Sequence, residues 1–315
     1  MKISIIGAGN VGSMLAERIL AHNLSDVVLL DIVEGLARGK ALDLLDASFV
    51  FGYKKRITGT ADYKETKNSD VVVVTAGLPR KPGMSREDLL NKNSAIIKSV
   101  TKDVKEFSPE AILVIVTNPL DVMTYLAYKE SGFKKNKVFG MAGNLDASRF
   151  KALLYEELGV RPDKIETYVL GSHGDTMVPL VSRTRICGKG LTNVLSKAAI
   201  EKVLERTKKR GGEIVALLKS GSAHFSPSAA CFDILKSVAS DAKKTIPCSC
   251  IMTGEYGITD CAIGVPAIIG KNGVEEILKW DLAESEKEAL LYSAKKVRET
   301  LNKLEGAENA RSKQA

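Results

Sequence analysis

The chain has 315 residues, of which 44% are apolar and 27% charged, and a formal net charge of +8. This length and composition predict a soluble globular protein with two coupled domains or one large α/β unit. They exclude a membrane-spanning helix, because no run reaches the roughly 18 uninterrupted apolar residues that one requires. They also argue against a signal peptide, because the apolar run after Lys2 already ends at Gly7.

The five cysteines are an odd and scattered set, which favours free thiols and a cytoplasmic location. Cys248 and Cys250 are separated by one residue, a poor match to the spacing of zinc ligands, so no metal site is predicted. The Lys/Arg clusters at 54–56 and 208–210 are short and lack interleaved aromatic residues. Nucleic-acid binding is therefore the less favoured explanation of the positive charge. A solvated surface explains it better, and a positive field also suits organic acids as substrates.

The N-terminal segment alternates between strand and helix patterns. Apolar runs at Lys2–Ile6 and 27–30 predict two buried strands, and residues 10–22 carry apolar side chains at helical spacing. The turn between the first strand and the helix has the pattern Gly-x-Gly-x-x-Gly, and the second strand ends at Asp31. The turn consists of Gly7, Ala8, Gly9, Asn10, Val11 and Gly12.

In this context each of these residues has a physical role in binding a dinucleotide. Gly7 allows a tight turn, Gly9 lets a pyrophosphate touch the backbone, and Gly12 lets the helix pack closely on the sheet. Free N–H groups at the helix N-terminus bind the phosphates. Asp31 accepts hydrogen bonds from the ribose hydroxyls, and its charge repels a 2′-phosphate. The pattern therefore predicts a dinucleotide site that prefers NAD over NADP.

Later apolar runs predict a parallel sheet that is covered on both faces. Strands are expected at residues 70–75, 111–117 and 137–140, with helical patterns between them. Two of these strands end in small or polar residues, at Thr75-Ala76-Gly77 and Thr117-Asn118-Pro119, and open α/β sheets bind ligands at such carboxyl ends. We therefore predict an α/β fold in which residues 1–142 form a doubly wound Rossmann domain.

Residues 143–315 have a different pattern and are predicted to form an α+β domain that binds the substrate. Expected here are a helix at 146–158, a strand at 165–170, a helical stretch at 211–240 that breaks at Ser226-Pro227, an antiparallel meander of short strands at 245–273, a long helix at 284–304 and a frayed tail at 306–315.

His173 is one of only three histidines, and it follows the predicted strand in the turn Gly171-Ser172-His173-Gly174. Glycines there let a small molecule approach the backbone, and the pKa of an imidazole suits proton exchange near neutrality. A lone histidine more often packs or caps a turn. The residues around it in the chain must therefore decide between these interpretations.

Asp146 and Arg149 are three residues apart at the start of one predicted helix, so they share a face. A carboxylate beside His173 would fix the tautomer of the ring and stabilise its protonated form. Arg149 would then present a planar fork to a substrate carboxylate. An ordinary ion pair within the helix explains the spacing equally well.

The segment that follows Gly77 is a proline- and glycine-containing loop at 78–86 with several cations, including Arg80 and Arg86. One interpretation is a solvated, mobile loop. The other is a lid that closes over an anionic substrate and excludes water.

Taken together, these motifs resemble the lactate/malate dehydrogenase family, and most of all the malate dehydrogenases built on the lactate dehydrogenase plan. The resemblance covers most of the chain in the expected order. It rests on the turn at 7–12 with Asp31, and on the segments 76–93, 117–124, 144–149 and 171–179.

The resemblance implies roles for individual residues. His173 would accept the proton when malate is oxidised, and Asp146 would orient it. Arg149 would bind the C1 carboxylate, and Arg86 and Asn118 would contact the C2 oxygen. The implied cofactor site consists of the six turn residues (Gly7, Ala8, Gly9, Asn10, Val11, Gly12), Asp31, Thr75, Ala76, Gly77, Asn93, Val116 and Asn118.

Arg80 would determine the substrate. Lactate-specific relatives carry glutamine at the matching position, whereas a guanidinium pairs with the second carboxylate of malate or oxaloacetate. A monocarboxylate would leave a buried cation unpaired, which costs several kcal/mol. Ala223 also fits the malate type, while His224 and Ser172 depart from the family pattern and leave fine specificity open.

The resemblance also implies a homodimer or homotetramer that acts on malate and oxaloacetate with NAD, without nucleic acid or membrane as a partner. Two alternatives remain open. A dehydrogenase for lactate or another 2-hydroxy acid would keep every role except that of Arg80. A non-catalytic NAD-binding protein would make the combination of His173, Asp146, Arg149 and Arg86 accidental.

Overall fold

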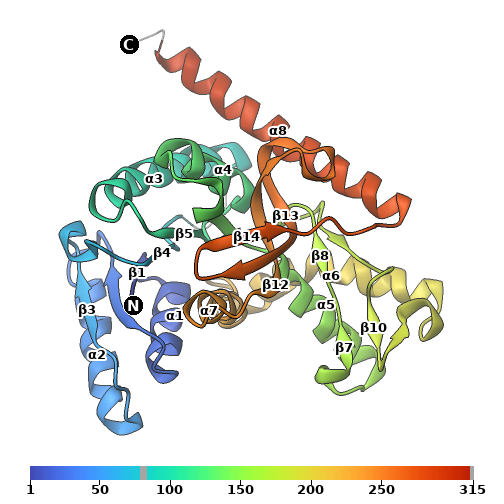
Figure 1. The fold of residues 1–315 in the computed structure, drawn as a ribbon, viewed down its shortest axis with the longest axis horizontal. Helices are drawn as coiled ribbons and strands as arrows, with labels where there is room; N and C mark the ends of the chain where they lie inside the picture. Colours follow the sequence, from blue (N-terminus) through green and yellow to red (C-terminus); the bar gives the residue numbers. More distant parts are fainter. Residues whose placement is uncertain (79–83, 313–315) are drawn as a thin grey trace.

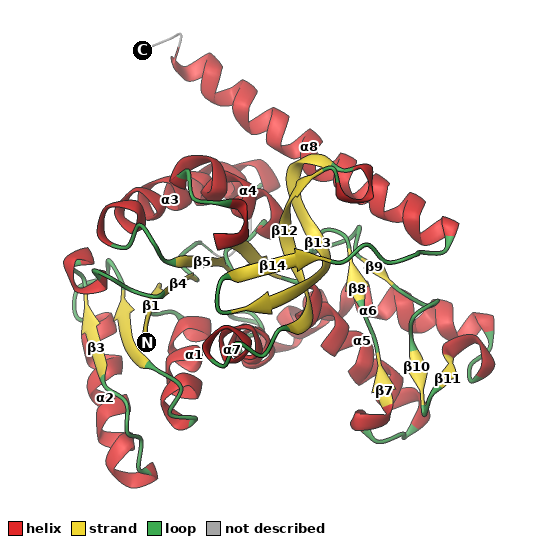
Figure 2. Ribbon diagram, viewed as in Figure 1, coloured by secondary structure: helices red, strands yellow, loops and turns green. Residues whose placement is uncertain are grey.

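A computed structural model describes residues 1–78 and 84–312 of the chain. Its centre is a nine-stranded sheet with helices on both sides (Figures 1 and 2). The strands of this sheet are β1 (Lys2–Ile6), β2 (Asp26–Leu30), β3 (Ile57–Thr60), β4 (Val71–Val74), β5 (Ile112–Ile115), β6 (Val138–Met141), β12 (Lys244–Thr253), β13 (Thr259–Gly270) and β14 (Gly273–Ile277). The helices are α1 (Asn10–Ala21), α2 (Leu36–Phe51), α3 (Arg86–Phe107), α4 (Leu120–Ser131), α5 (Gly143–Leu158), α6 (Lys197–Leu218), α7 (Phe225–Ala239) and α8 (Glu284–Ser312).

Six strands form a parallel sheet in the order β3-β2-β1-β4-β5-β6. The four valines of β4 are fully buried, because helices cover both faces of the sheet. The chain winds from β1 outward to β2 and β3, then returns to place β4 on the other side of β1. The doubly wound α/β fold predicted from the sequence is thereby confirmed, and its winding reverses between β1 and β4.

Helices cover this sheet in two layers, with α1 packed against α7 and α3 packed against α4 (Figure 1). The inward face of α1 carries Leu15, Ala16, Ile19 and Leu20, all of which are buried. This is the apolar stripe predicted for residues 10–22. The helix N-terminus is therefore fixed against the sheet directly behind the glycine turn.

The antiparallel strands predicted at 245–273 are also present, but β12 and β13 are long rather than short. β12 pairs antiparallel with β6, so β12, β13 and β14 extend the parallel sheet across residue 142. The second half of the chain thus contributes three strands to the sheet of the first half. A continuous sheet holds the two halves in a fixed relation.

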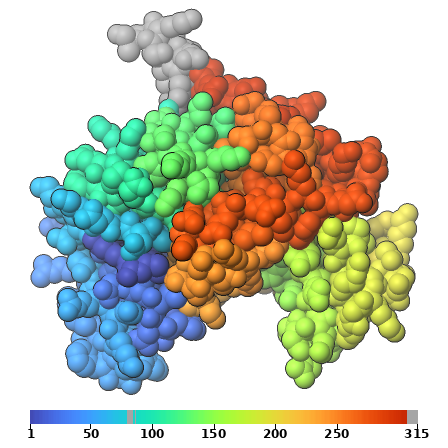
Figure 3. Space-filling view, viewed as in Figure 1, coloured from blue at the N-terminus to red at the C-terminus, as the bar shows by residue number. Residues whose placement is uncertain are grey.

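A second hydrophobic core lies outside this sheet. It is built on α5 and α6 together with the short strands β7 (Ile165–Glu166), β8 (Val169–Leu170) and β10 (Arg185–Ile186), and it includes Phe150, Leu153 and Leu154. The strand β11 (Lys189–Gly190) pairs with β10. In the space-filling view this yellow-green and yellow part projects at the lower right, and a notch separates it from the golden part that contains α7 (Figure 3). This lobe is the part of the α+β region that stands apart from the sheet.

The prediction of one continuous strand at 165–170 is wrong. This segment is divided into β7 and β8, which pair in different sheets; the partner of β8 is β9 (Val178–Pro179). Thr167 lies between them, and its hydroxyl donates to the carbonyl of Ala147 on α5. This contact to α5 anchors the chain at the point where the single strand was expected to continue.

Two further boundaries differ from the prediction. The helical stretch breaks at 219–224, where Lys219 and Gly221 have positive φ, and not at Ser226-Pro227. Pro227 is the third residue of α7, where its missing N–H would have had no partner within the helix. At the C-terminus, α8 continues to Ser312 instead of fraying from Gly306. In the part of the chain described here, no helix is long and apolar enough to cross a membrane.

Candidate active site

The turn at 7–12 lies at the carboxyl end of β1, beside the segment that follows β4. Gly7 has φ +106°, and a Cβ atom built there would lie 2.7 Å from the amide nitrogen of Ala76. A Cβ on Gly12 would overlap the carbonyl oxygen of Gly7, whereas a Cβ on Gly9 would meet nothing within 4 Å. Gly7 and Gly12 are thus required by internal packing. Gly9 borders open space at the N-terminus of α1. The N-termini of helices commonly bind phosphate groups.

Asp31 holds this turn from β2. Its carboxylate accepts hydrogen bonds from the amide of Ala8 at 2.7 Å and from the amide of Val33 at 3.0 Å. The sequence analysis missed Lys40 of α2, whose Nζ donates to the carbonyl of Ala8 at 2.6 Å and to the hydroxyl of Ser13 at 2.9 Å. The backbone amide and the backbone carbonyl of Ala8 are therefore both held by hydrogen bonds to side chains. No sequence pattern in the turn points to Lys40, because it comes from a different helix.

The segment after β4 is packed against the end of β5. Thr75 donates its hydroxyl proton to the carbonyl of Gly7 at 2.9 Å, and Thr117 donates to the carbonyl of Ala76 at 2.6 Å. A side chain at Gly77 would meet Thr117 at 2.6 Å. The ends of β1, β4 and β5 thus form one edge, as predicted.

The side chain of Asn93, a residue predicted to line the cofactor site, is buried between two backbone segments. Its side chain is 1% exposed and binds three backbone groups: the amide and carbonyl of Leu78 and the carbonyl of Asn118. Asn93 therefore connects Leu78, which follows β4, to Asn118, which follows β5. Val116 is half-buried and Asn118 is exposed at that strand end.

His173 and Asp146 lie together. The Nδ1 atom of His173 is 2.8 Å from a carboxylate oxygen of Asp146, and the two side chains are 17% and 2% exposed. Because the carboxylate accepts, Nδ1 carries the proton, which leaves Nε2 free to accept a proton from a bound hydroxyl. Burial lowers the pKa of His173, but Asp146, together with Asp121, outweighs burial and raises that pKa above the ordinary value.

Arg149 lies beside the same carboxylate, with Nη1 3.4 Å from Asp146. Its side chain is 11% exposed, and among the described residues its buried Nε has no hydrogen-bond partner. A buried donor without a partner is costly, so a partner supplied by a ligand would be strongly bound. The planar guanidinium fits a carboxylate.

Two arginines, Arg80 and Arg86, were expected on the loop at 78–86, and the structure describes only the second of them. Arg80 lies outside the described residues. Arg86 is the first residue of α3 rather than part of the loop, because Ser85 caps that helix and forms a reciprocal capping box with Asp88. The backbone at 86 is therefore helical.

Two other side chains that the sequence analysis missed hold the histidine turn. Asp121, on α4, accepts a hydrogen bond from the amide of His173 at 2.9 Å, and Ser293, on α8, accepts one from the amide of Ser172 at 2.8 Å. Thr176 also lies 2.9 Å from Ser293. These contacts come from positions 52 to 121 residues away in the chain. They bring the histidine turn to the start of α4, directly after the end of β5.

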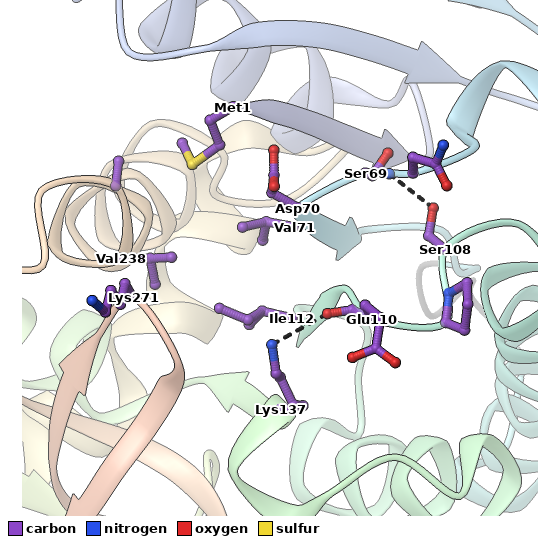
Figure 4. Close-up of a pocket in the computed structure, with 13 residues that line it drawn as sticks. Met1, Ser69, Asp70, Val71, Ser108, Glu110, Ile112, Lys137, Val238 and Lys271 are labelled. Carbon is purple, nitrogen blue, oxygen red and sulfur yellow. Dashed lines mark hydrogen bonds between the residues drawn. The ribbon is translucent and has the colours of Figure 1, made fainter.

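The cavity shown in Figure 4 lies elsewhere. It is lined by residues such as Met1, Asp70, Glu110 and Lys137, which precede β1, β4, β5 and β6. These are the amino ends of the parallel strands, opposite to the edge where such sheets bind ligands. Among the described residues, no group of three or more His, Cys, Asp or Glu side chains is arranged to hold a metal ion.

A glycine-rich turn at the start of a helix and a histidine–aspartate pair, both at the carboxyl edge of a doubly wound sheet, are typical of dinucleotide-dependent oxidoreductases. The profile of the lactate/malate dehydrogenase NAD-binding domain matches residues 1–140, and that of the family's α/β C-terminal domain matches residues 143–308. The chain therefore belongs to the lactate/malate dehydrogenase family.

Several known proteins are similar along the whole chain. A malate dehydrogenase of Chlorobium limicola is 48% identical over 97% of this chain and 99% of its own length. The structure of a malate dehydrogenase from Salinibacter ruber superposes with a TM-score of 0.94 at 43% identity, covering 98% of this chain and 99% of that one. A lactate dehydrogenase of Cryptosporidium parvum, complexed with lactic acid and NAD, superposes with a TM-score of 0.93 at 39% identity, covering 96% and 98%.

Proposed function

We propose that this protein is an NAD-dependent malate dehydrogenase, which interconverts (S)-malate and oxaloacetate. The observation that carries the proposal is the His173–Asp146 pair beside a buried arginine whose Nε lacks a partner among the described residues. A base with a free Nε2 and an adjacent carboxylate binder are what the oxidation of a 2-hydroxy acid requires. Relatives 45–48% identical over nearly the whole chain are malate dehydrogenases.

When bound, NAD supplies the hydride acceptor. The chain's own residues do the rest. The open backbone at Gly9 and the N–H groups of α1 receive the phosphates, and Asp31 meets the adenosine ribose. Arg149 binds the carboxylate next to the reacting carbon. His173 takes the hydroxyl proton on Nε2, and Asp146 stabilises the imidazolium that results.

The fold alone does not select malate over lactate, since the lactate dehydrogenase of Cryptosporidium parvum superposes as well as several malate dehydrogenases. Arg80 supports malate, because a guanidinium can pair with the second carboxylate of a four-carbon diacid. The sequence identity to malate dehydrogenases supports the same choice. Lactate or another 2-hydroxy acid is the second candidate.

The test compares kcat/KM for oxaloacetate and for pyruvate with NADH, in the wild type and in Arg80→Gln. We expect the wild type to prefer oxaloacetate and the variant to lose about a hundredfold or more of that activity, because a charged pair is removed. Arg185→Gln, on β10, serves as a matched control. A wild type that prefers pyruvate, or an Arg80→Gln variant with unaltered preference, contradicts the assignment.

We further propose that the chain divides into an NAD-binding domain at 1–142 and a catalytic domain at 143–315, and that it assembles into a homodimer or homotetramer. The exposed apolar end of α2 supports assembly, because Phe49, Val50 and Phe51 are 72–85% exposed. Light scattering of the wild type and of Phe49→Lys tests it.

The five free cysteines support a cytoplasmic location, where the reaction belongs to the tricarboxylic acid cycle.

A further inference from the structure

A second carboxylate lies behind the histidine turn, and the reaction outlined above does not use it. Asp121 is 2% exposed, at the second position of α4. Its Oδ2 accepts hydrogen bonds from the Ser172 hydroxyl at 2.8 Å and from the His173 amide at 2.9 Å, and its Oδ1 accepts one from the Ser249 hydroxyl at 2.7 Å. It thus joins α4, β12 and the histidine turn.

The three groups that donate to Asp121 are all uncharged. A buried carboxylate is costly unless donors or an opposite charge compensate it. The N-terminal turn of α4 supplies a favourable dipole, and three donors satisfy both oxygens. Burial raises the pKa of Asp121 above its usual value, and these donors and the nearby His173 offset only part of this rise. The backbone amide of His173 can only donate, so Oδ2 of Asp121 acts as its acceptor.

The charged and titratable groups around Asp121 and His173 come from several elements. On α5, Asp146 is bound to the His173 ring and Arg149 opposes protonation of that ring. On β13, Cys261 faces Asp121, and burial raises the pKa of this thiol to about 12, so the thiol is neutral. β12 and α8 contribute the hydroxyls of Ser249 and Ser293 to the cluster. The protonated ring of His173 is therefore the cation that Asp121 faces.

We propose that Asp121 is a positioning residue with an electrostatic role: its buried negative charge holds the histidine turn and favours the protonated form of His173. His173 then lies between two carboxylates, with Asp146 on its ring and Asp121 behind its backbone. The imidazolium that forms when a hydroxyl proton is taken up is stabilised from both sides. This role rests on the proposed function of His173 as the proton acceptor.

Asp121→Asn separates charge from geometry. The amide oxygen can keep the bonds from Ser172 and His173, and the amide nitrogen can donate to Ser249, whose hydroxyl also accepts. The chain has three histidines, so their ring signals can be assigned in an NMR titration of the cofactor-free protein. We expect the pKa of His173 to fall, by less than the loss of Asp146 would cause, because Asp121 is the smaller of the two electrostatic contributions. In the pH profile of oxaloacetate reduction, kcat/KM should decline at correspondingly lower pH.

Ser249→Ala is the matched control, because it removes one hydrogen bond from Asp121 and leaves the charge. A pKa of His173 that does not move in Asp121→Asn overturns the proposal. An equal fall in Ser249→Ala overturns it as well, because packing would then explain the effect.

Should Asp121→Asn not fold, the Asp121 side-chain carbon signal of the wild type decides. We expect an ionised carboxylate between pH 6 and 8, and a protonated one would refute the role. The ring titration needs no turnover. A shifted His173 pKa in a protein without malate dehydrogenase activity would therefore defeat the proposed function, while the effect of the Asp121 charge on His173 would still be shown.

Discussion

The turn at 7–12, named the cofactor turn because we propose that it binds NAD, and the histidine turn at 171–174 are held in the same way. In each, an aspartate accepts a hydrogen bond from a backbone amide. Asp31 binds the amide of Ala8, and Asp121 binds the amide of His173. The difference lies in distance and burial. Asp31 is half-buried and belongs to the same strand–helix–strand unit as its turn, whereas Asp121 is buried and comes from a helix 52 residues before the histidine.

This difference separates a local site from an assembled one. A local turn works as a unit, so changes there should affect cofactor binding and little else. The histidine turn depends on α4, α5 and α8 together, so changes there should affect proton transfer through charge and geometry. The following predictions test this separation, beginning with the largest effect.

Replacing His173 by asparagine removes the proton acceptor and leaves the cofactor turn untouched. We expect kcat to fall by about a thousandfold or more, because general acid–base catalysis contributes on this scale. NAD affinity, measured by calorimetry, should be unchanged. His22→Asn, at the exposed end of α1, is the control and should retain full activity. Loss of NAD binding in His173→Asn would mean that the two turns are not separate.

Glycine substitutions within the cofactor turn should differ from each other. Gly9→Ala adds a methyl group to open space, so we expect an unchanged melting temperature and an NAD affinity lower by about tenfold, or 1.4 kcal/mol. Gly12→Ala overlaps the Gly7 carbonyl, so it should also destabilise the fold by about 1–3 kcal/mol. Thermal unfolding and NAD titration of both variants distinguish the two roles. Equal stability losses would contradict the geometry of the turn.

The raised pKa of His173 fixes the direction of the pH dependence. Malate oxidation needs the neutral ring, so kcat/KM should rise as pH increases through this pKa, while oxaloacetate reduction should fall over the same interval. The His173–Asp146 contribution to folding is complete below about pH 6.5, the ordinary value for histidine, and is lost as pH rises through the raised value. Initial rates in both directions across pH test the prediction. Parallel profiles in the two directions would argue against His173 as the titrating group.

The smallest effect concerns Ser293, which holds the histidine turn without a charge. Ser293→Ala leaves the Ser172 amide without its partner and should cost about 1 kcal/mol, or roughly 2 °C in melting temperature. The pKa of His173 should stay the same. A shift in that pKa as large as the one expected for Asp121→Asn would remove the distinction between the charged and the uncharged support.

The local turn could be predicted from the sequence, whereas most of the contacts that hold the histidine turn could not. The turn at 7–12, Asp31 and β1 could be predicted because strand periodicity, glycine spacing and the strand end lie within one short segment. Asp146 could be paired with His173 only through the family resemblance. Asp121, Ser293 and Lys40 carry no local signal, because their partners become neighbours only when the sheet is complete. The break at 219–224 was missed because a proline in the first turn of a helix resembles a helix break.

The central claim is tested most directly by a crystal structure of the protein with NAD and a non-reactive dicarboxylate. We expect His173 Nε2 within hydrogen-bond distance of the C2 substituent, Arg149 on the adjacent carboxylate and Arg80 on the distant one. A His173 ring remote from the nicotinamide would contradict the proposed enzyme, and Arg80 in solvent over the bound diacid would contradict the choice of malate.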